Sequence, residues 1–265
     1  GHVRALKNAR QKQIGVADED YVPPRHGQHL VLTLDSNIQM IAEEELAAAC
    51  RKYKAKRGEA IILDPQTGEV LALANFPTFN PQNLEDSTPE IRRNRALTDP
   101  GEFGSVMKPF IAGPAMMWRI TQPAEIWSIP GISYTTPYGR RITDVHGYGK
   151  LAMWDVLVKS SNIGMSMLAA RMGNPKLFTA LTSFGYGKLT GIDLPGEDGG
   201  RVNPLARWTR YSTESVAQGY EMMATPLQIT RAFCVYANGG RLVPLRLKKG
   251  LLEADGTVAQ AARPV

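Results

Sequence analysis

The chain has 265 residues, of which 43% are hydrophobic and 21% are charged, and its formal net charge at pH 7 is +6. This length and apolar content are enough for one large domain with a substantial core. A mildly basic surface suits an anionic membrane, a cell-wall polymer or nucleic acid, but no lysine-rich block is interleaved with aromatic residues, which disfavours nucleic-acid binding.

Residues 1–28 are polar and basic and contain the pair Pro23-Pro24, which predicts a linker or extended arm. The segment lacks the hydrophobic core of a signal peptide, and no apolar run in the chain reaches the roughly 18 residues that span a bilayer. Gly1-His2 is typical of what remains after a tag is cleaved. We therefore expect a piece of a longer protein, whose other parts can include a membrane anchor.

The first predicted elements are a short strand over residues 30–35 and a helix that follows it. The strand stops at Asp35-Ser36, a pair that favours a helix N-cap. Glutamates come early in the helix and Lys/Arg late, as the helix dipole prefers. At helical spacing, one face collects Ile38, Ile41, Ala42, Leu46, Ala49 and Tyr53.

Residues 59–75 predict a β-hairpin, because two apolar runs flank the turn sequence PQTG. Neither run alternates cleanly, so we expect both faces of the hairpin to be covered by helices. Beyond residue 105 the pattern is mostly helical, apart from a Gly/Tyr/Pro-rich loop region over residues 128–150. A later helix is predicted from a capping box at Thr225 and Gln228, and it ends at residues 238–240.

The cysteines and histidines favour no metal site. Cys50 and Cys234 are the only cysteines, and we expect them to be small buried hydrophobic residues. His26 and His29 form a pair without an evident third ligand, which favours a surface or turn role.

The stretch GEFGSVMKPF at residues 101–110 suggests covalent catalysis. If a helix runs from Ser105 to about residue 119, Lys108 lies one turn on, within reach of the serine hydroxyl, and the helix N-terminus suits an oxyanion. Pro109 then falls in the first turn, where its missing N–H costs little. Lysine can activate the serine only with a pKa well below about 10.4, so the motif predicts a desolvated Lys108. A capping serine followed by a surface lysine is the plainer alternative.

A second element, KSSNIG at residues 159–164, favours the catalytic interpretation. Ser160 and Asn162 are two residues apart in a turn before a helix, so both can point into one cleft. A hydroxyl there can relay a proton between Lys108 and a leaving amine, and an amide can hold a peptide group of a substrate. A helix cap made of serine and asparagine is the structural alternative.

Together, GSVMKPF and the later SSN resemble the penicillin-binding proteins, the serine acyltransferases that cross-link bacterial cell wall. Gln218-Gly219 is similar to a glycine-rich segment near that family's cleft. Four further stretches are similar to the class B, monofunctional branch: LVLTLDSNIQMIAEEEL, ILDPQTGEVLALANFPTFNP, FGYGKLTGIDLPGE and ATPLQITRAFCVYANGG.

The resemblance implies an α/β (α+β) fold of the penicillin-binding/serine β-lactamase type, with an antiparallel sheet flanked by helices and a mainly helical subdomain. Residues 29–265 would be an incomplete transpeptidase domain, and residues 1–28 a linker from an upstream pedestal domain. Ser105 would be the acylated nucleophile, Lys108 its base, Ser160 a proton relay and Asn162 a contact to the substrate amide.

The implied reaction is peptidoglycan D,D-transpeptidation. Ser105 attacks the D-Ala-D-Ala bond of a stem peptide, and the acyl group then passes to an amine on a neighbouring strand, without a metal or organic cofactor. β-Lactams would acylate the same serine. The family places such an enzyme at the outer face of the bacterial cytoplasmic membrane, with nascent peptidoglycan and a membrane glycosyltransferase as partners.

One family motif, Lys-Thr/Ser-Gly, is missing from the sequence. Lys188-Leu189-Thr190-Gly191 has an extra residue and lies in a different segment of the family's order. We expect the motif and the C-terminal strands of the sheet to lie beyond Val265, and the chain alone to be inactive if they are required. Two alternatives therefore stay open: a β-lactamase or D,D-carboxypeptidase that transfers the acyl group to water, and a non-catalytic β-lactam sensor or scaffold of a division or elongation complex.

Overall fold

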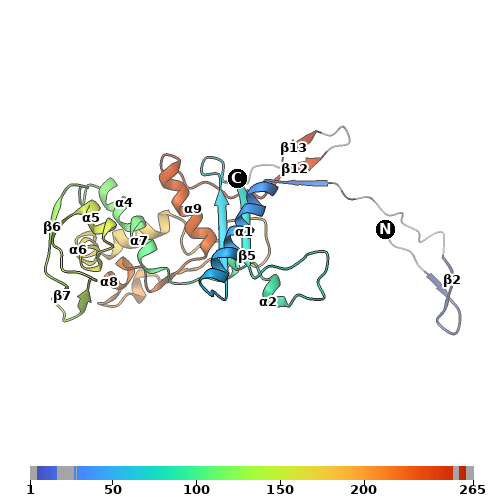
Figure 1. Ribbon diagram of the computed structural model, residues 1–265, viewed down its shortest axis with the longest axis horizontal. Coiled ribbons are helices and arrows are strands. Elements are labelled where there is room, and N and C mark those ends of the chain that lie inside the picture. Colours follow the sequence, from blue (N-terminus) through green and yellow to red (C-terminus); the bar gives the residue numbers. More distant parts are fainter. Residues whose placement is uncertain (1–4, 17–26, 28, 253–256, 261–265) are drawn as a thin grey trace. The chain divides into compact units, whose positions relative to one another are not determined.

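The computed structural model describes residues 5–16, 27, 29–252 and 257–260 (Figure 1). The chain divides into two compact units, one of residues 1–32 with 248–265 and one of residues 33–247. The predicted division into an arm over residues 1–28 and a transpeptidase domain over residues 29–265 stays a prediction. His26 lies outside the described residues.

The first unit consists of antiparallel strands. A hairpin pairs β1 (Ala5–Lys7) with β2 (Gln13–Val16), so the predicted arm contains regular structure. A three-stranded sheet has the order β13-β12-β3. Its strands are β3 (His29–Leu32), β12 (Lys248–Leu252) and β13 (Val258–Gln260). The strand predicted over residues 30–35 is therefore shorter at its C-terminal end.

The second unit contains the predicted β-hairpin, made of β4 (Gly58–Leu63) and β5 (Val70–Phe76). In the turn, Gly68 has a φ of +74°, and a Cβ there would overlap the carbonyl oxygen of Pro244, so only glycine fits. One face of the hairpin packs on α1 (Ser36–Lys52) and the other on α3 (Arg95–Thr98) and α9 (Pro226–Ala237) (Figure 1). The expected helical cover on both faces is confirmed.

The predicted helix after Asp35 is confirmed as α1, and the Asp35 carboxylate accepts hydrogen bonds from the amides of Asn37 and Ile38. Its predicted apolar face is wrong in part, because Ile41 is 56% and Tyr53 74% exposed, and Ala49 is exposed as well. The amide of Gln39 pairs with the backbone of Leu73 on β5, which orients the helix so that Ile41 points away from the hairpin. The stripe that packs inward is Ile38, Ala42, Leu46 and Cys50.

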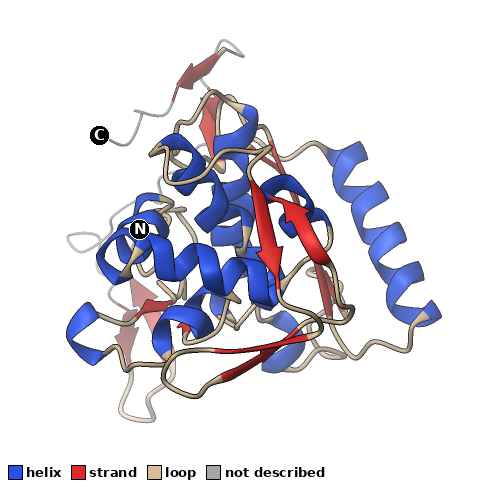
Figure 2. Cartoon of the chain, turned by 90° about the vertical axis from the view of Figure 1, so that its left-hand side faces the viewer, coloured by secondary structure: helices blue, strands red, loops and turns tan. Residues whose placement is uncertain are grey.

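Most of the remaining helices form a mainly helical lobe around the largest hydrophobic core (Figure 2). Phe110 and Ile111 of one helix and Ile163 and Met165 of another are fully buried there. The helices of the lobe are the 3-10 helix η2 (Gly104–Met107), α4 (Pro109–Met117), α5 (Met153–Val158), α6 (Asn162–Met172), α7 (Asn174–Ser183) and α8 (Ser212–Ala217).

The region predicted as a loop over residues 128–150 instead contains short antiparallel strands. They form two pairs, β6 (Ile126–Ile129) with β9 (Gly149–Ala152) and β7 (Ser133–Thr135) with β8 (Arg141–Thr143). Runs of three or four residues are too short for a reliable alternation signal. The other short elements are α2 (Pro89–Arg92), η3 (Leu205–Arg207) and the pair β10 (Arg201–Val202) and β11 (Met222–Met223).

The predicted capping box of α9 is confirmed. The Thr225 hydroxyl accepts from the amide of Gln228, and the Gln228 side chain accepts from the amide of Thr225. The helix ends at Ala237, and Gly239 and Gly240 adopt positive φ. Cys50 and Cys234 are free and buried, as predicted.

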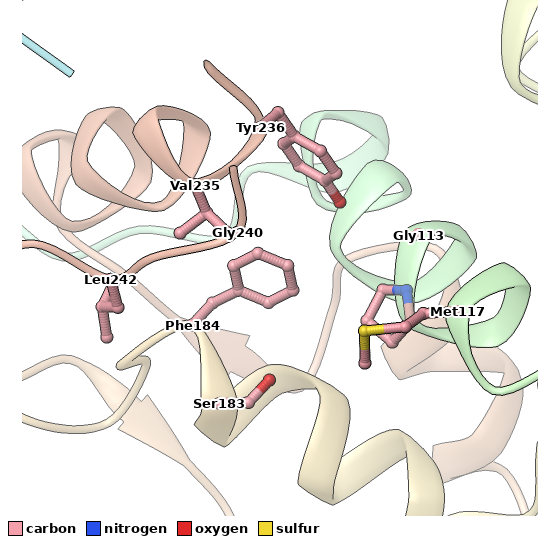
Figure 3. Close-up of a pocket in the computed structure, with 9 residues that line it drawn as sticks. Gly113, Met117, Ser183, Phe184, Val235, Tyr236, Gly240 and Leu242 are labelled. Carbon is pink, nitrogen blue, oxygen red and sulfur yellow. The ribbon is translucent and has the colours of Figure 1, made fainter. Parts of the chain in front are cut away.

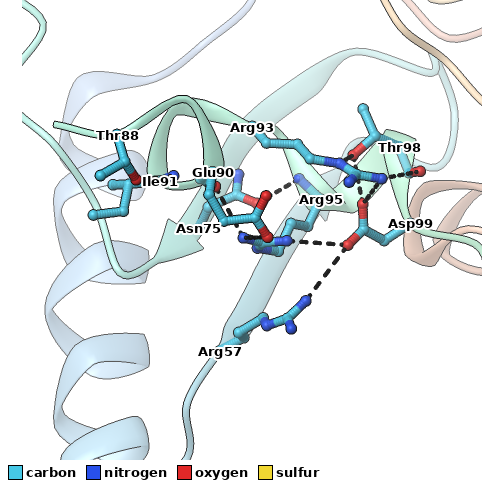
Figure 4. Close-up of polar contacts among 9 residues, drawn as sticks. All are labelled: Arg57, Asn75, Thr88, Glu90, Ile91, Arg93, Arg95, Thr98 and Asp99. Carbon is cyan, nitrogen blue, oxygen red and sulfur yellow. Dashed lines mark hydrogen bonds and ion pairs between the residues drawn. The ribbon is translucent and has the colours of Figure 1, made fainter.

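A buried arginine organises the segment between the hairpin and the lobe (Figure 4). Arg95 is 6% exposed and forms ion pairs with Glu90 at 2.8 Å and with Asp99 at 3.1 Å. Arg93 also pairs with Asp99, at 2.7 Å. These ion pairs join α2 to α3, and the Asn75 side chain of β5 accepts a hydrogen bond from the amide of Arg95 at 3.0 Å, which ties α3 to the hairpin. Within the described part of the chain, no helix is long and apolar enough to cross a membrane.

Candidate active site

Ser105 lies in the 3-10 turn η2 and is exposed, with Gly104 before it at a φ of +54°. The predicted single helix over residues 105–119 is therefore wrong in part, because η2 precedes α4 and α4 ends at Met117. Pro109 occupies the first position of α4, as expected. Since residues i and i+3 eclipse in a 3-10 helix, Lys108 still follows Ser105 on the same side of the turn.

Lys108 is buried, with only 1% of its surface exposed. Its ammonium nitrogen donates to the carbonyl oxygen of Ser160 at 2.6 Å, to the Ser160 hydroxyl at 3.0 Å and to the Asn162 amide oxygen at 2.8 Å. Burial lowers the pKa of Lys108 from its usual 10.5 to about 8, and the nearby Asp144 carboxylate opposes this shift. The expected desolvated lysine is confirmed, and the plainer alternative of a surface lysine is wrong.

Ser160 and Asn162 meet at the Lys108 nitrogen, as the predicted common cleft requires. Ser160 has a φ of +53°, a conformation that costs a non-glycine residue about 1 kcal/mol or more and that often occurs at functional sites. The helix cap is the middle residue of SSN: Ser161 caps α6, and its hydroxyl accepts from the amide of Gly164 at 2.9 Å. The capping interpretation thus holds for Ser161, which leaves Ser160 and Asn162 free to contact Lys108.

The loop after α8 supports the nucleophile turn. Gly101 exchanges two backbone hydrogen bonds with Ala224, and the Glu221 amide donates to the Glu102 carboxylate at 2.8 Å. Gly219, singled out in the sequence, packs against the backbone of Gly104. Residues 218–224 therefore hold the segment that presents Ser105.

Sequence reasoning missed Asp144, which directly follows β8. This buried carboxylate accepts hydrogen bonds from the Ser161 hydroxyl and from the amides of Asn162 and Ile163. A lone aspartate after a three-residue strand carries no motif, and its partners lie 17 to 19 positions further along the chain.

Thr190 of the KLTG sequence does not contribute to this site. The Thr190 hydroxyl donates to the Glu197 carboxylate at 2.5 Å in its own loop. Among the described residues, no group of three His, Cys, Asp or Glu side chains is placed to hold a metal ion.

A separate cavity of about 440 Å³ lies between α4, α7 and α9 (Figure 3). Its lining is mostly apolar and includes Met117, Phe184 and Leu242. The Tyr236 hydroxyl points toward α4 and donates to the carbonyl oxygen of Pro109 at 2.6 Å. None of Ser105, Lys108, Ser160 and Asn162 lines this cavity.

Comparison with known proteins gives the family of the chain. The family model described as "Penicillin binding protein transpeptidase domain" matches residues 58–264. The chain therefore belongs to the penicillin-binding protein transpeptidase family. Its α/β fold, with an antiparallel hairpin flanked by helices and a helical lobe, is the fold that the sequence predicted.

Curated relatives of the chain are named peptidoglycan D,D-transpeptidases. The chain is 36% identical over 242 residues to a probable peptidoglycan D,D-transpeptidase, PbpC, of Pseudomonas aeruginosa, covering 91% of this chain and 42% of the relative. It is 36% identical over 224 residues to the peptidoglycan D,D-transpeptidase FtsI of Escherichia coli K12, covering 83% and 37%. The chain thus spans less than half the length of these two relatives.

Solved structures are similar over most of the chain. Penicillin binding protein 3 from Mycobacterium tuberculosis, complexed with aztreonam, is 33% identical with a TM-score of 0.84, covering 91% of this chain and 54% of that one. A peptidoglycan glycosyltransferase from Burkholderia ambifaria is 34% identical with a TM-score of 0.75, covering 87% and 68%.

Proposed function

We propose that the chain carries the catalytic site of a peptidoglycan D,D-transpeptidase, with Ser105 as the nucleophile. The observation that carries this proposal is the buried Lys108 ammonium group, held by Ser160 and Asn162 three residues after an exposed serine. A lysine that serves as the base for a serine hydroxyl must be desolvated, because only a lowered pKa makes the neutral amine available. A lysine with a structural role has no such requirement.

In the first half-reaction, Ser105 Oγ attacks the carbonyl carbon between the two D-alanines of a stem peptide. Neutral Lys108 takes the hydroxyl proton. As the tetrahedral adduct collapses, Lys108 returns a proton through the Ser160 hydroxyl to the nitrogen of the departing D-alanine. The C–N bond breaks and a Ser105 ester remains. The 3.0 Å contact between Lys108 Nζ and Ser160 Oγ suits this relay.

In the second half-reaction, an amine of a neighbouring stem peptide attacks the ester. Its excess proton passes to Lys108 and then to Ser105 Oγ, which leaves as the free hydroxyl while the new amide bond forms. Asn162 contributes its side-chain amide to the peptide groups of the substrate. These steps use protein groups alone, because the acyl-enzyme route divides the barrier into two smaller ones.

The family also suggests where the protein works. We assign it to the outer face of a bacterial cytoplasmic membrane, with peptidoglycan stem peptides as substrates and β-lactams as acylating inhibitors. The aztreonam complex of the mycobacterial neighbour supports the assignment of β-lactams as inhibitors. A membrane glycosyltransferase is a proposed partner. Residues 1–28 are proposed to join the catalytic domain to an upstream domain.

The test is a cross-linking assay with a synthetic stem peptide ending in D-Ala-D-Ala and an excess of an amine acceptor. We expect release of D-alanine and an acceptor-linked product of the matching mass, both absent from the Ser105→Ala variant. Release of D-alanine with only the hydrolysed product would indicate a carboxypeptidase. Failure to release D-alanine from a folded chain that penicillin acylates would favour a sensor.

A further inference from the structure

The turn that contains Ser160 and Asn162 forms hydrogen bonds with one buried carboxylate, that of Asp144. Asp144 is 8% exposed and sits at the end of β8, where its own amide donates to the carbonyl oxygen of Ile132 at 3.0 Å. The carboxylate oxygen Oδ2 accepts from the Ser161 hydroxyl at 2.5 Å. The other oxygen, Oδ1, accepts from the backbone amide of Asn162 at 2.5 Å and from that of Ile163 at 3.1 Å.

These bonds fix both groups that contact Lys108. The Ser161 hydroxyl donates to Asp144 and accepts from the amide of Gly164. Because Ser161 is fixed in this way, the preceding Ser160 stays in its left-handed conformation. The neighbouring Thr143 carbonyl accepts from the Asn162 side-chain nitrogen at 3.1 Å. Since that nitrogen is bound, the Asn162 amide oxygen is turned toward Lys108.

Asp144 also acts on Lys108 by its charge. Among the described residues, it is the charged group whose field opposes the effect of burial on Lys108. The atoms of Ser160 and Asn162 that accept from the ammonium group are neutral. Asp144 therefore affects Lys108 in two ways: its hydrogen bonds position the turn that contacts the lysine, and its negative charge favours the protonated lysine.

We propose that Asp144 is a positioning residue for the Ser105 reaction, acting through Ser161 and the start of α6 to hold Ser160 and Asn162 on Lys108. The catalytic consequence of this inference rests on the proposed function. The hydrogen bonds between Asp144 and the turn do not depend on it. The Asp144 carboxylate binds the backbone amide of Asn162 and forms no hydrogen bond with Ser105 or with the side chain of Asn162.

Two variants separate the hydrogen bonds from the charge. Asp144→Ala removes both. Asp144→Asn keeps an amide oxygen that can accept from the two backbone amides, and its nitrogen can donate to the Ser161 hydroxyl, while the negative charge is lost. Asp35→Asn is the matched control, because Asp35 caps α1 in the same way away from Lys108.

The first readout needs no catalysis: the NMR titration of Lys108 Nζ in lysine-labelled protein, assigned by its absence in Lys108→Met. We expect both Asp144 variants to move the titration of Lys108 to lower pH, since a favourable negative charge is gone. The Asp35 control should leave it in place. A Lys108 titration unchanged in both Asp144 variants would overturn the proposal.

The second readout is the rate of Ser105 acylation by benzylpenicillin in folded protein, with melting temperature recorded for each variant. On the plateau above pH 9, where Lys108 is neutral in all variants, a displaced turn should slow acylation of Asp144→Ala by about 10²-fold, and Asp144→Asn should recover most of that loss. Wild-type rates in Asp144→Ala would overturn the proposal. A wild-type chain that is folded but never acylated would instead count against the proposed function, and the lysine titration would then decide the role of Asp144.

Discussion

Gly219 and Gly104 touch backbone to backbone. A Cβ atom on Gly219 would overlap the carbonyl oxygen of Gly104 and stand 2.7 Å from its carbonyl carbon. Gly219 also has a φ of +85°, which side chains rarely adopt. Because Gly104 immediately precedes Ser105, the position of the nucleophile depends on a glycine from a distant loop.

Gly219→Ala should therefore displace the turn that carries Ser105. We expect acylation by a fluorescent penicillin to fall by about tenfold or more, since small displacements of reacting groups are costly. The matched control is Gly191→Ala, where φ is +80° but a Cβ meets nothing within 4 Å. The control should lose stability without slowing acylation. Equal rates for the two variants in folded protein would show that the contact does not position Ser105.

The pH dependence of acylation should follow Lys108. Its pKa is about 8, and only the neutral amine can take the Ser105 proton. The acylation rate constant should therefore increase by about tenfold from pH 7 to a plateau above pH 9, as expected for a single group with that pKa. Lys108→Arg should be slow at all pH values, because a guanidinium does not lose its proton. A flat wild-type profile would exclude Lys108 as the base.

The buried lysine should also weaken the folded state at neutral pH. The unfolded chain binds this proton with a pKa near 10.5 and the folded chain with a pKa of about 8, so between these values the unfolded state holds more protons. Stability contributed at this position therefore increases with pH across that window. Relative to Lys108→Met, wild type should gain about 2 kcal/mol in free energy of unfolding between pH 7 and pH 10. If urea unfolding gave the same difference in unfolding free energy between wild type and Lys108→Met at pH 7 and at pH 10, the result would contradict this prediction.

Arg95 should matter for stability and not for chemistry. Its guanidinium is buried between Glu90 and Asp99, whereas Arg93, which also pairs with Asp99, is much more exposed (Figure 4). Arg95→Met should cost about 2 kcal/mol of unfolding free energy, because it leaves Asp99 without its buried partner. Arg93→Met should cost clearly less. A larger loss for Arg93→Met in urea unfolding would show that the cluster is organised differently.

Much of the site could be predicted because its signals are local. Ser105 and Lys108 are three residues apart, and the capping box of Thr225 and Gln228 is complete within four residues. Local spacing determines such contacts whether the turn is an α-helix or a 3-10 helix. For the same reason, the hairpin over residues 59–75 and the start of α1 at Ser36 were predicted correctly.

The parts that sequence reasoning missed depend on contacts between distant residues. Asp144 acquires its role only because β8 ends beside the start of α6. The resemblance to the family singles out Gly219, but its contact with the backbone of Gly104 comes only from the structure. The exposed Ile41 shows the same limit, since helical spacing gives the faces of a helix but tertiary packing selects which one is buried.

Activation of Ser105 by Lys108 is tested most directly by the intact mass of the chain after incubation with excess benzylpenicillin, beside Ser105→Ala and Lys108→Met. We predict a single adduct with the mass of the intact penicillin on wild type, stable for hours, and no adduct on either variant. An adduct that persists in Ser105→Ala, or a folded wild-type chain that stays unmodified, would contradict the claim that Ser105 and Lys108 form an activated nucleophile in this chain.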